Sequence, residues 1–147
     1  MFNEADPSIE KTLITTKLGK LTQYQRLLRI LQANTLEDFT SDFKTSGAPE
    51  RYLQVAIECI IDIGNEIISS LQLQRPERYG DIPYILAEAK IIPKTFTETI
   101  ASLIGFRNLL VHDYASINPN LGYEFLQTKL PDFENFSKHI AKWLEKA

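Results

Sequence analysis

The chain has 147 residues, of which 44% are hydrophobic and 24% charged, and its formal net charge is −3. This length fits one domain spanning residues 1–147 around a single core, and the composition excludes a disordered chain. No apolar run approaches the roughly 20 residues needed to cross a bilayer, and the first ten residues are acidic and polar, unlike a signal peptide. We therefore expect a cytosolic protein that does not associate with membranes.

The first predicted element is a long helix with Ser8 as a possible N-cap, ending at about Gln32. Its apolar residues recur at helical spacing, at Leu18, Leu21, Leu28 and Leu31. Thr35 then starts a short helical turn, and Gly47 and Pro49 predict a loop. Pro49 also suits the first turn of the next helix.

The second long helix, from Pro49 to about Leu73, is apolar around most of its circumference. The apolar positions are Tyr52, Leu53, Val55, Ala56, Ile57, Ile60, Ile61, Ile63, Ile67, Ile68 and Leu71. Such a helix needs more than one partner: either it lies at the centre of a bundle, or one side meets a second copy of the chain. Cys59 is predicted to pack in the core, because it lacks the partners of a disulfide or a zinc site.

Shorter elements occupy the middle of the chain. A short helix is predicted from about Ile82 to Lys90, and Pro93 then opens a further helix that runs to about Val111. Connections between these elements are short, which favours antiparallel neighbours.

The last helical region begins at Asn118 and Pro119 and continues to Trp143. Pro131 should kink or divide it near Leu130. Nothing alternates with period two for long enough to indicate a sheet. The elements together predict an all-α fold, an antiparallel bundle of four main helices with one or two short helices.

The charge balance bears on nucleic-acid binding. A net negative charge argues against a broad surface for RNA or DNA, because phosphate binding draws on an excess of Lys and Arg. One segment does gather basic residues, namely Lys17, Lys20, Arg26 and Arg29. A local basic patch is one interpretation, but the pattern by itself favours a solvated helix face.

The segment FRNLLVHDY, residues 106–114, carries the candidate chemistry. The imidazole of His112 can take the proton of a ribose 2′-hydroxyl near pH 7 and later return it. Arg107 is permanently charged, and its guanidinium fork matches phosphoryl oxygens in the transition state. Such a pair could cleave RNA without a metal and leave a 2′,3′-cyclic phosphate. Residue types alone, however, favour a structural alternative: a solvated arginine and a histidine stabilised by the helix dipole.

The spacing R-x-x-x-x-H-x-Y of Arg107, His112 and Tyr114 resembles the motif of HepT toxins, a branch of the HEPN superfamily. The likeness covers nearly the whole chain, through the first helix, the TLEDF turn, the AIECIIDIGNEI helix and the terminal helix. It implies a helical homodimer whose two motifs face each other across a cleft and form a composite, metal-independent ribonuclease site. Arg107 and His112 would be catalytic, and Asn108 would support them by hydrogen bonds.

The same resemblance implies a regulatory partner. HepT toxins are usually paired with an MntA-like nucleotidyltransferase antitoxin that adenylylates the motif tyrosine, here Tyr114. The added phosphates would place negative charge beside Arg107 and His112 and obstruct the entry of RNA, the implied substrate. No cofactor is implied.

Several alternatives stay open at this point. The chain could be a non-catalytic HEPN-type module that docks onto a nucleotidyltransferase, or a structural helical adaptor. A polar strip on the second helix consists of Gln54, Glu58, Asp62 and Asn65, at spacings that share one face. Its acidic residues, Glu58 and Asp62, either help to hold Arg107 or His112 or simply face solvent. His139 lacks an arginine at the motif spacing and is predicted to be structural or exposed.

Overall fold

The computed structural model describes residues 7–41, 43–112 and 119–147. These ranges contain, in order, α1 (Pro7–Leu31), α2 (Leu36–Ser41), α3 (Phe43–Ser70), the 3-10 helix η1 (Tyr79–Asp81), α4 (Ile82–Glu88), the 3-10 helix η2 (Lys94–Phe96), α5 (Thr97–His112) and α6 (Pro119–Lys146). Within them there is no strand, and the predicted all-α fold is confirmed. None of the helices described combines the length and apolar character needed to span a membrane.

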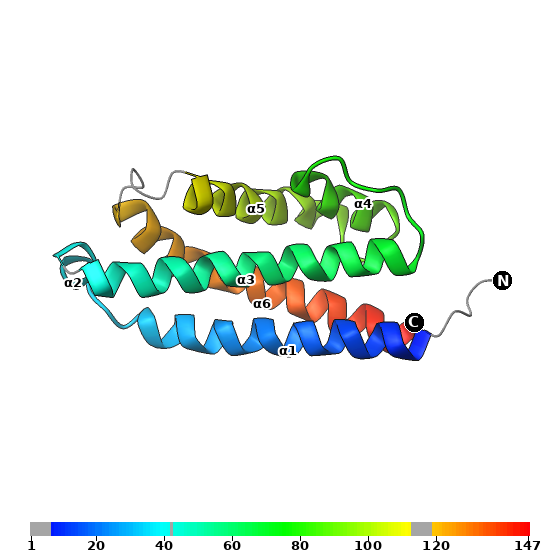
Figure 1. The fold of residues 1–147 in the computed structure, drawn as a ribbon, viewed down its shortest axis with the longest axis horizontal. Helices are drawn as coiled ribbons and strands as arrows, with labels where there is room; N and C mark the ends of the chain where they lie inside the picture. Colours follow the sequence, from blue (N-terminus) through cyan, green and yellow to red (C-terminus); the bar gives the residue numbers. More distant parts are fainter. Residues whose placement is uncertain (1–6, 42, 113–118) are drawn as a thin grey trace.

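The four long helices, α1, α3, α5 and α6, form an antiparallel bundle (Figure 1). Helix α3 lies in the middle: α1 runs along one side, α4 and α5 lie on the opposite side, and α6 crosses behind. All of these helices contact α3. Each long helix reverses the direction of the one before it, which is the up-and-down arrangement that short connections favour.

Helix α3 supplies the centre of the hydrophobic core. Its buried apolar side chains are Leu53, Ala56, Ile57, Cys59, Ile60, Ile61, Ile63, Ile67 and Ile68. They pack against the other helices of the same chain, so a position at the centre of the bundle accounts for the breadth of this apolar surface. Burial, and then the negative charge of Asp62, raise the pKa of the Cys59 thiol, which fits its predicted place in the core.

Helix α3 begins well before its predicted start. The sequence predicts a loop at Gly47 and Pro49, but residues 43–48 are helical and Pro49 lies inside α3, so this prediction is wrong. A proline inside a helix removes one backbone hydrogen bond. The Pro49 ring is buried and α2 packs against α3 at this end, and this packing offsets the missing bond.

Two other boundary predictions concern Pro131 and Ser8. Helix α6 continues through Pro131, so the predicted division is wrong; Leu130 and Phe133 on either side are almost fully buried and hold both flanks in the core. A kink at Pro131 stays a prediction. Helix α1 starts at Pro7, whose fixed φ suits the first helical position, so Ser8 lies within the helix and is not its N-cap.

Helices α3 and α4 approach closely at Gly64. A Cβ atom at this position would collide with Cγ2 of Ile82, a fully buried side chain at the start of α4. Gly64→Ala is therefore expected to destabilise the protein by about 1–3 kcal/mol, the usual range for overpacking, although alanine is the better helix former. Urea denaturation would measure this change.

Gly19→Ala is the matched control, because Gly19 lies on an exposed part of α1 with no atom near the position of a Cβ. It is expected to stabilise the protein by up to about 1 kcal/mol through helix propensity alone. Equal shifts of the denaturation midpoint in the two variants would contradict the close contact between Gly64 and Ile82.

Candidate active site

Packing between α5 and α6 restricts the direction in which the Arg107 side chain projects from α5. Leu103 and Leu110 of α5 are buried, and Phe106 lies between them on the same inward face. The Phe106 ring stacks on Phe125 of α6, with ring centroids 3.9 Å apart and an angle of 7° between the planes. Because Phe106 immediately precedes Arg107, this stack restricts the direction of the arginine side chain.

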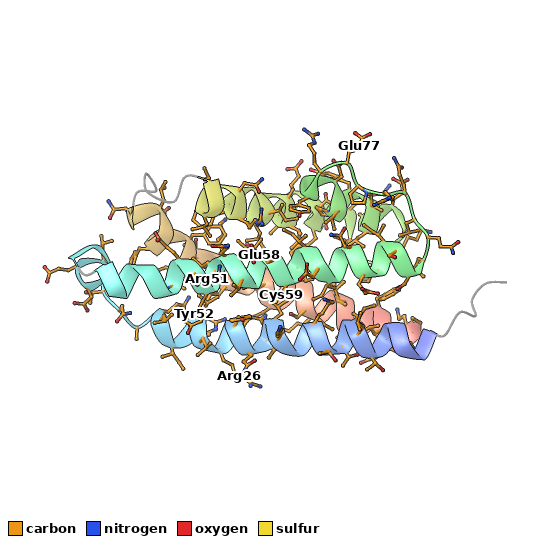
Figure 2. All side chains as sticks on the ribbon, viewed as in Figure 1. Arg26, Arg51, Tyr52, Glu58, Cys59 and Glu77 are labelled. Carbon is orange, nitrogen blue, oxygen red and sulfur yellow. The ribbon has the colours of Figure 1, made fainter. Side chains whose placement is uncertain are left out.

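Arg107 forms an ion pair with Glu58. Figure 2 shows Glu58 in the middle of α3. Its Nε and Nη2 both donate to Glu58 Oε2, at 3.3 and 3.2 Å. The two side chains are 18% and 32% exposed, so water screens the pair only partly. Gln54 Nε2 donates to the same oxygen at 3.2 Å. One edge of the guanidinium is therefore fixed, and Nη1 lies outside the ion pair.

Tyr79 lies against the same guanidinium. Arg107 Cζ is 5.4 Å from the centroid of the Tyr79 ring, within the range of a cation–π contact. The turn before Tyr79 is held by Asp81, whose Oδ2 accepts hydrogen bonds from the backbone N–H groups of Glu77 and Arg78, at 3.1 and 3.0 Å. Sequence patterns do not identify Tyr79 as a site residue, because the Asp81 turn is a local signal that does not indicate the distant arginine.

The remaining motif residues extend to the end of α5 and beyond it. Asn108 is exposed, and its Oδ1 accepts a hydrogen bond from Arg107 Nη1 at 3.4 Å. Helix α5 ends at His112, whose side chain lies outside the described residues, as does Tyr114. The structure thus brings Arg107 and Asn108 together, and the meeting of Arg107 with His112 stays a prediction.

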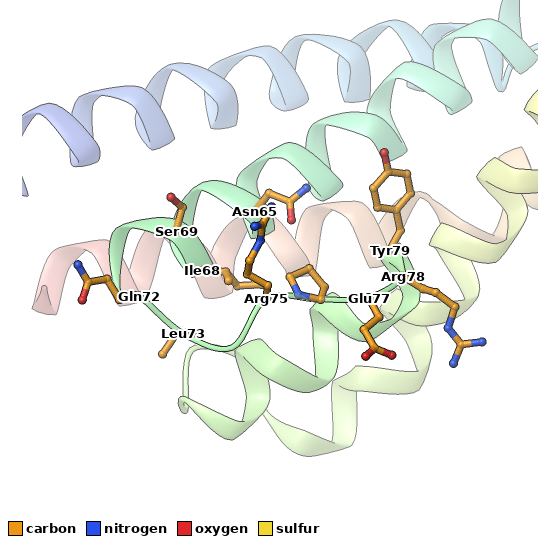
Figure 3. Close-up of a pocket in the computed structure, with 10 residues that line it drawn as sticks. Asn65, Ile68, Ser69, Gln72, Leu73, Arg75, Glu77, Arg78 and Tyr79 are labelled. Atoms are coloured by element: carbon orange, nitrogen blue, oxygen red, sulfur yellow. The ribbon is translucent and has the colours of Figure 1, made fainter.

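A pocket of about 870 Å³ lies next to Tyr79 (Figure 3). It is formed by the end of α3 and the loop that leads to η1, through Asn65, Ile68, Ser69, Gln72, Leu73, Arg75, Pro76, Glu77, Arg78 and Tyr79. Figure 3 shows Arg75 reaching from the loop toward Asn65, whereas Glu77 and Arg78 point away from the Tyr79 ring. Since Tyr79 contacts Arg107 as well, this pocket adjoins the motif arginine.

Most of the chain matches a known family. A family model described as Ribonuclease HepT-like matches residues 20–140. The chain belongs to the HepT-like ribonuclease family. The family resemblance that the motif indicated is therefore confirmed, together with ribonuclease as the class of enzyme. The matched region of this HepT-like ribonuclease includes the whole motif, as well as Glu58 and Tyr79, which contact its arginine.

Individual relatives agree with the family match. The HepT-like chain is 28% identical over 137 residues to the tRNA nuclease HepT of Aphanizomenon flos-aquae, with 93% of each chain covered. It is 29% identical over 121 residues to the mRNA nuclease HepT of Shewanella oneidensis, with 81% of this chain and 91% of the relative covered. A solved structure of the tri-AMPylated Shewanella oneidensis HEPN toxin in complex with MNT antitoxin is similar, with a TM-score of 0.80, 27% identity, and 88% of this chain and 96% of that chain covered.

The residues of the polar strip of α3 have different surroundings in the HepT-like chain. Glu58 holds Arg107, so the first of the two alternatives for this strip applies to it. Asp62 is exposed and lines a groove of about 420 Å³ on the α1 side of α3. Within the described ranges, no group of three or more His, Cys, Asp or Glu side chains is arranged to hold a metal ion.

The basic segment of α1 lies beside acidic side chains. Lys17 and Lys20 line the same groove as Asp62. Arg29 pairs with Glu134 of α6 at 2.6 Å. The charges of this segment are therefore partly balanced, which agrees with the solvated helix face that the sequence favours.

Proposed function

We propose that this HepT-like ribonuclease is the toxin of a toxin–antitoxin pair and cleaves RNA without a metal ion, with Arg107 and His112 catalytic and Asn108 supporting them. The fixed edge of the Arg107 guanidinium carries the proposal. Glu58 occupies Nε and one hydrogen of Nη2, and Asn108 accepts one hydrogen of Nη1, which leaves the second hydrogen of each Nη for a phosphate. An arginine oriented in this way needs little rearrangement when negative charge develops on the phosphoryl oxygens.

The reaction needs a base for the 2′-hydroxyl and an acid for the leaving oxygen. Neutral His112 removes the 2′ proton, the 2′ oxygen attacks the adjacent phosphorus, and the bond from phosphorus to the 5′ oxygen breaks. Arg107 stabilises the negative charge on the phosphoryl oxygens. The products are a 2′,3′-cyclic phosphate and a 5′-hydroxyl that has taken up a proton.

A homodimer would supply a second proton-transfer group. In an in-line displacement the attacking and leaving oxygens lie on opposite sides of the phosphorus, so one histidine cannot contact both at once. Two copies with facing motifs would place the second His112 beside the leaving oxygen. Exposed apolar side chains at the motif end of the bundle support such an interface: Leu109 is 45% exposed and Leu121 is 51% exposed.

The pocket next to Tyr79 is suited to a nucleotide beside the cleaved phosphate. Tyr79 is 46% exposed and offers its ring for stacking on a base. Arg75 offers a positive charge for a phosphate, and Asn65 offers an amide for hydrogen bonds to a base edge. These groups support RNA as the substrate.

Regulation is proposed at Tyr114, two residues after His112. The related Shewanella oneidensis HEPN toxin is described as tri-AMPylated and in complex with an MNT antitoxin. For this chain the partner would be an MntA-like nucleotidyltransferase that adenylylates Tyr114. Phosphates added there would compete with RNA for Arg107 and repel the RNA backbone.

The test is cleavage of a cellular RNA pool in EDTA, by protein that mass spectrometry shows to be unmodified at Tyr114. We expect 2′,3′-cyclic phosphate ends, no cleavage of an oligonucleotide with 2′-deoxyribose at the cleaved position, and no activity after adenylylation. Failure of the unmodified protein to cleave would favour a non-catalytic binding module. Cleavage of the deoxy substrate would overturn the 2′-hydroxyl mechanism, and activity only with an added divalent metal would overturn metal independence.

A further inference from the structure

An open pocket of about 390 Å³ lies where the connection from α4 to α5 meets the last turns of α6. Among the described residues that line it there is no acidic side chain, but there are four lysines, a histidine and a tryptophan: Lys90, Lys94, Lys142, Lys146, His139 and Trp143. We call this set the lysine pocket. Its positive charge contrasts with the net charge of −3 for the whole chain.

Two separate segments converge to form the lysine pocket. On α6, His139, Lys142 and Lys146 follow one another at spacings of three and four, so they share one face of the helix. The His139 ring is 5.1 Å from the ring of Phe96 in η2, and this structural contact joins that face to the segment before α5. Burial, and then the charge of Lys142, lower the pKa of His139, so the lysines carry the positive charge of the pocket.

Lys90 occupies a backbone position that normally favours glycine. Its φ is 64°, in the left-handed region. The hydrogen bonds that close α4 run from Ile91 N to Leu86 O and from Lys90 N to Ala87 O, each at 2.9 Å. Helices that end in this way usually carry glycine where Lys90 stands. The left-handed backbone disfavours lysine at this position. A role of the Lys90 side chain therefore explains the residue better than the backbone does.

We infer that the lysine pocket is a docking site for the phosphate backbone of the RNA substrate, separate from the site around Arg107. The inference rests on the proposed function, to which the RNA substrate belongs. Arg107 is ten residues after Thr97 at the start of α5, so about 15 Å of helix separates it from the pocket end of α5. A large RNA can therefore contact both places, whereas a dinucleotide or trinucleotide bound at Arg107 cannot.

The chemistry of the lysine pocket predicts what it contributes. Ammonium groups attract phosphates but do not distinguish one base from another. Docking there strengthens the binding of large RNAs and leaves the choice of the cleaved bond to the site around Arg107. It also explains how a chain with a net negative charge holds a polyanion, because four lysines line one pocket with no acidic side chain among its described lining residues.

The test uses the full chain with His112→Ala, which is expected to prevent cleavage, and measures binding of unfractionated transfer RNA by fluorescence anisotropy at several salt concentrations. The lysine-pocket variant combines Lys90→Gly, Lys94→Gln, Lys142→Gln and Lys146→Gln, and glycine suits the left-handed backbone at position 90. We expect affinity to fall by roughly tenfold or more, and the salt slope to fall by about 0.9 for each phosphate that the variant no longer neutralises.

Lys17→Gln with Lys20→Gln is the matched control and should bind nearly as tightly as the parent, because these lysines line a groove that contains carboxylates. With His112 intact, the lysine-pocket variant should cleave an RNA dinucleotide or trinucleotide at an unchanged rate. Unchanged affinity and salt slope would overturn the docking site, as would an equal loss in the control. Loss of short-substrate cleavage would also overturn it, because the lysines would then act at the active site or on the fold.

If the proposed function itself is wrong, the unsubstituted chain cleaves no RNA, long or short. This result does not depend on how the lysine-pocket variant binds transfer RNA, so the two failures can be distinguished.

Discussion

His112→Ala is expected to slow RNA cleavage by a factor of about 10²–10⁴, the usual contribution of a general acid or base. The imidazole is the group proposed to take the 2′ proton, and alanine leaves only water to do so. Single-turnover rates on a short RNA oligonucleotide in EDTA would measure the loss. Circular dichroism would establish that the variant keeps its helices.

Added imidazole separates lost chemistry from lost structure. A small base that diffuses into the site can replace the proton transfer without restoring any packing, so we expect partial recovery of His112→Ala. No such recovery is expected for a variant of Arg107. Cleavage by His112→Ala at the rate of the unsubstituted protein would contradict the catalytic role of this histidine.

Arg107→Ala is expected to lower kcat by about 10²–10³, the range seen when one donor to a developing oxyanion is removed. Arg107→Lys should recover only part of this loss, because lysine keeps the charge but lacks the planar fork that binds both Glu58 and a phosphate. Rates at saturating RNA, compared with KM, would separate transition-state stabilisation from substrate binding. Full activity of Arg107→Lys would show that charge alone suffices.

Glu58→Gln tests whether the ion pair acts through Arg107. We expect a smaller loss of about tenfold, because a neutral amide oxygen still accepts a hydrogen bond but orients the guanidinium less firmly. The double variant of Glu58→Gln and Arg107→Ala should then be no slower than Arg107→Ala alone, since the partner that Glu58 orients is absent. Additive losses would assign Glu58 a separate role.

The bundle could be predicted from the sequence because apolar periodicity determines which face each helix buries. Leu21 and Leu28 of α1 are fully buried, as their spacing predicts. Thr35 precedes α2, and its Oγ1 accepts a hydrogen bond from the backbone N–H of Asp38 at 3.1 Å. The loop predicted at Pro49 and the division predicted at Pro131 are wrong, because the rules for proline include the missing local hydrogen bond but not the packing against other helices.

The contacts of the candidate site were harder to predict, since they join distant segments. The motif identified Arg107, and the polar strip of α3 included Glu58, but neither pattern says that the two side chains meet. Tyr79 reaches Arg107 because η1 contacts both α4 and α5. The lysine pocket likewise combines residues of two segments that are distant in the sequence, so basic residues adjacent in the sequence do not indicate it.

The close approach at Gly64 links the core to the candidate site. Ile82 follows η1 directly, so we expect a larger residue at position 64 to displace α4 and η1 and to change the approach of Tyr79 to Arg107. Neither Gly64 nor Ile82 can change in size alone without displacing the other helix. Among HepT-like proteins these two positions should therefore covary, and a lineage that repacks them would also place its aromatic ring differently beside the motif arginine.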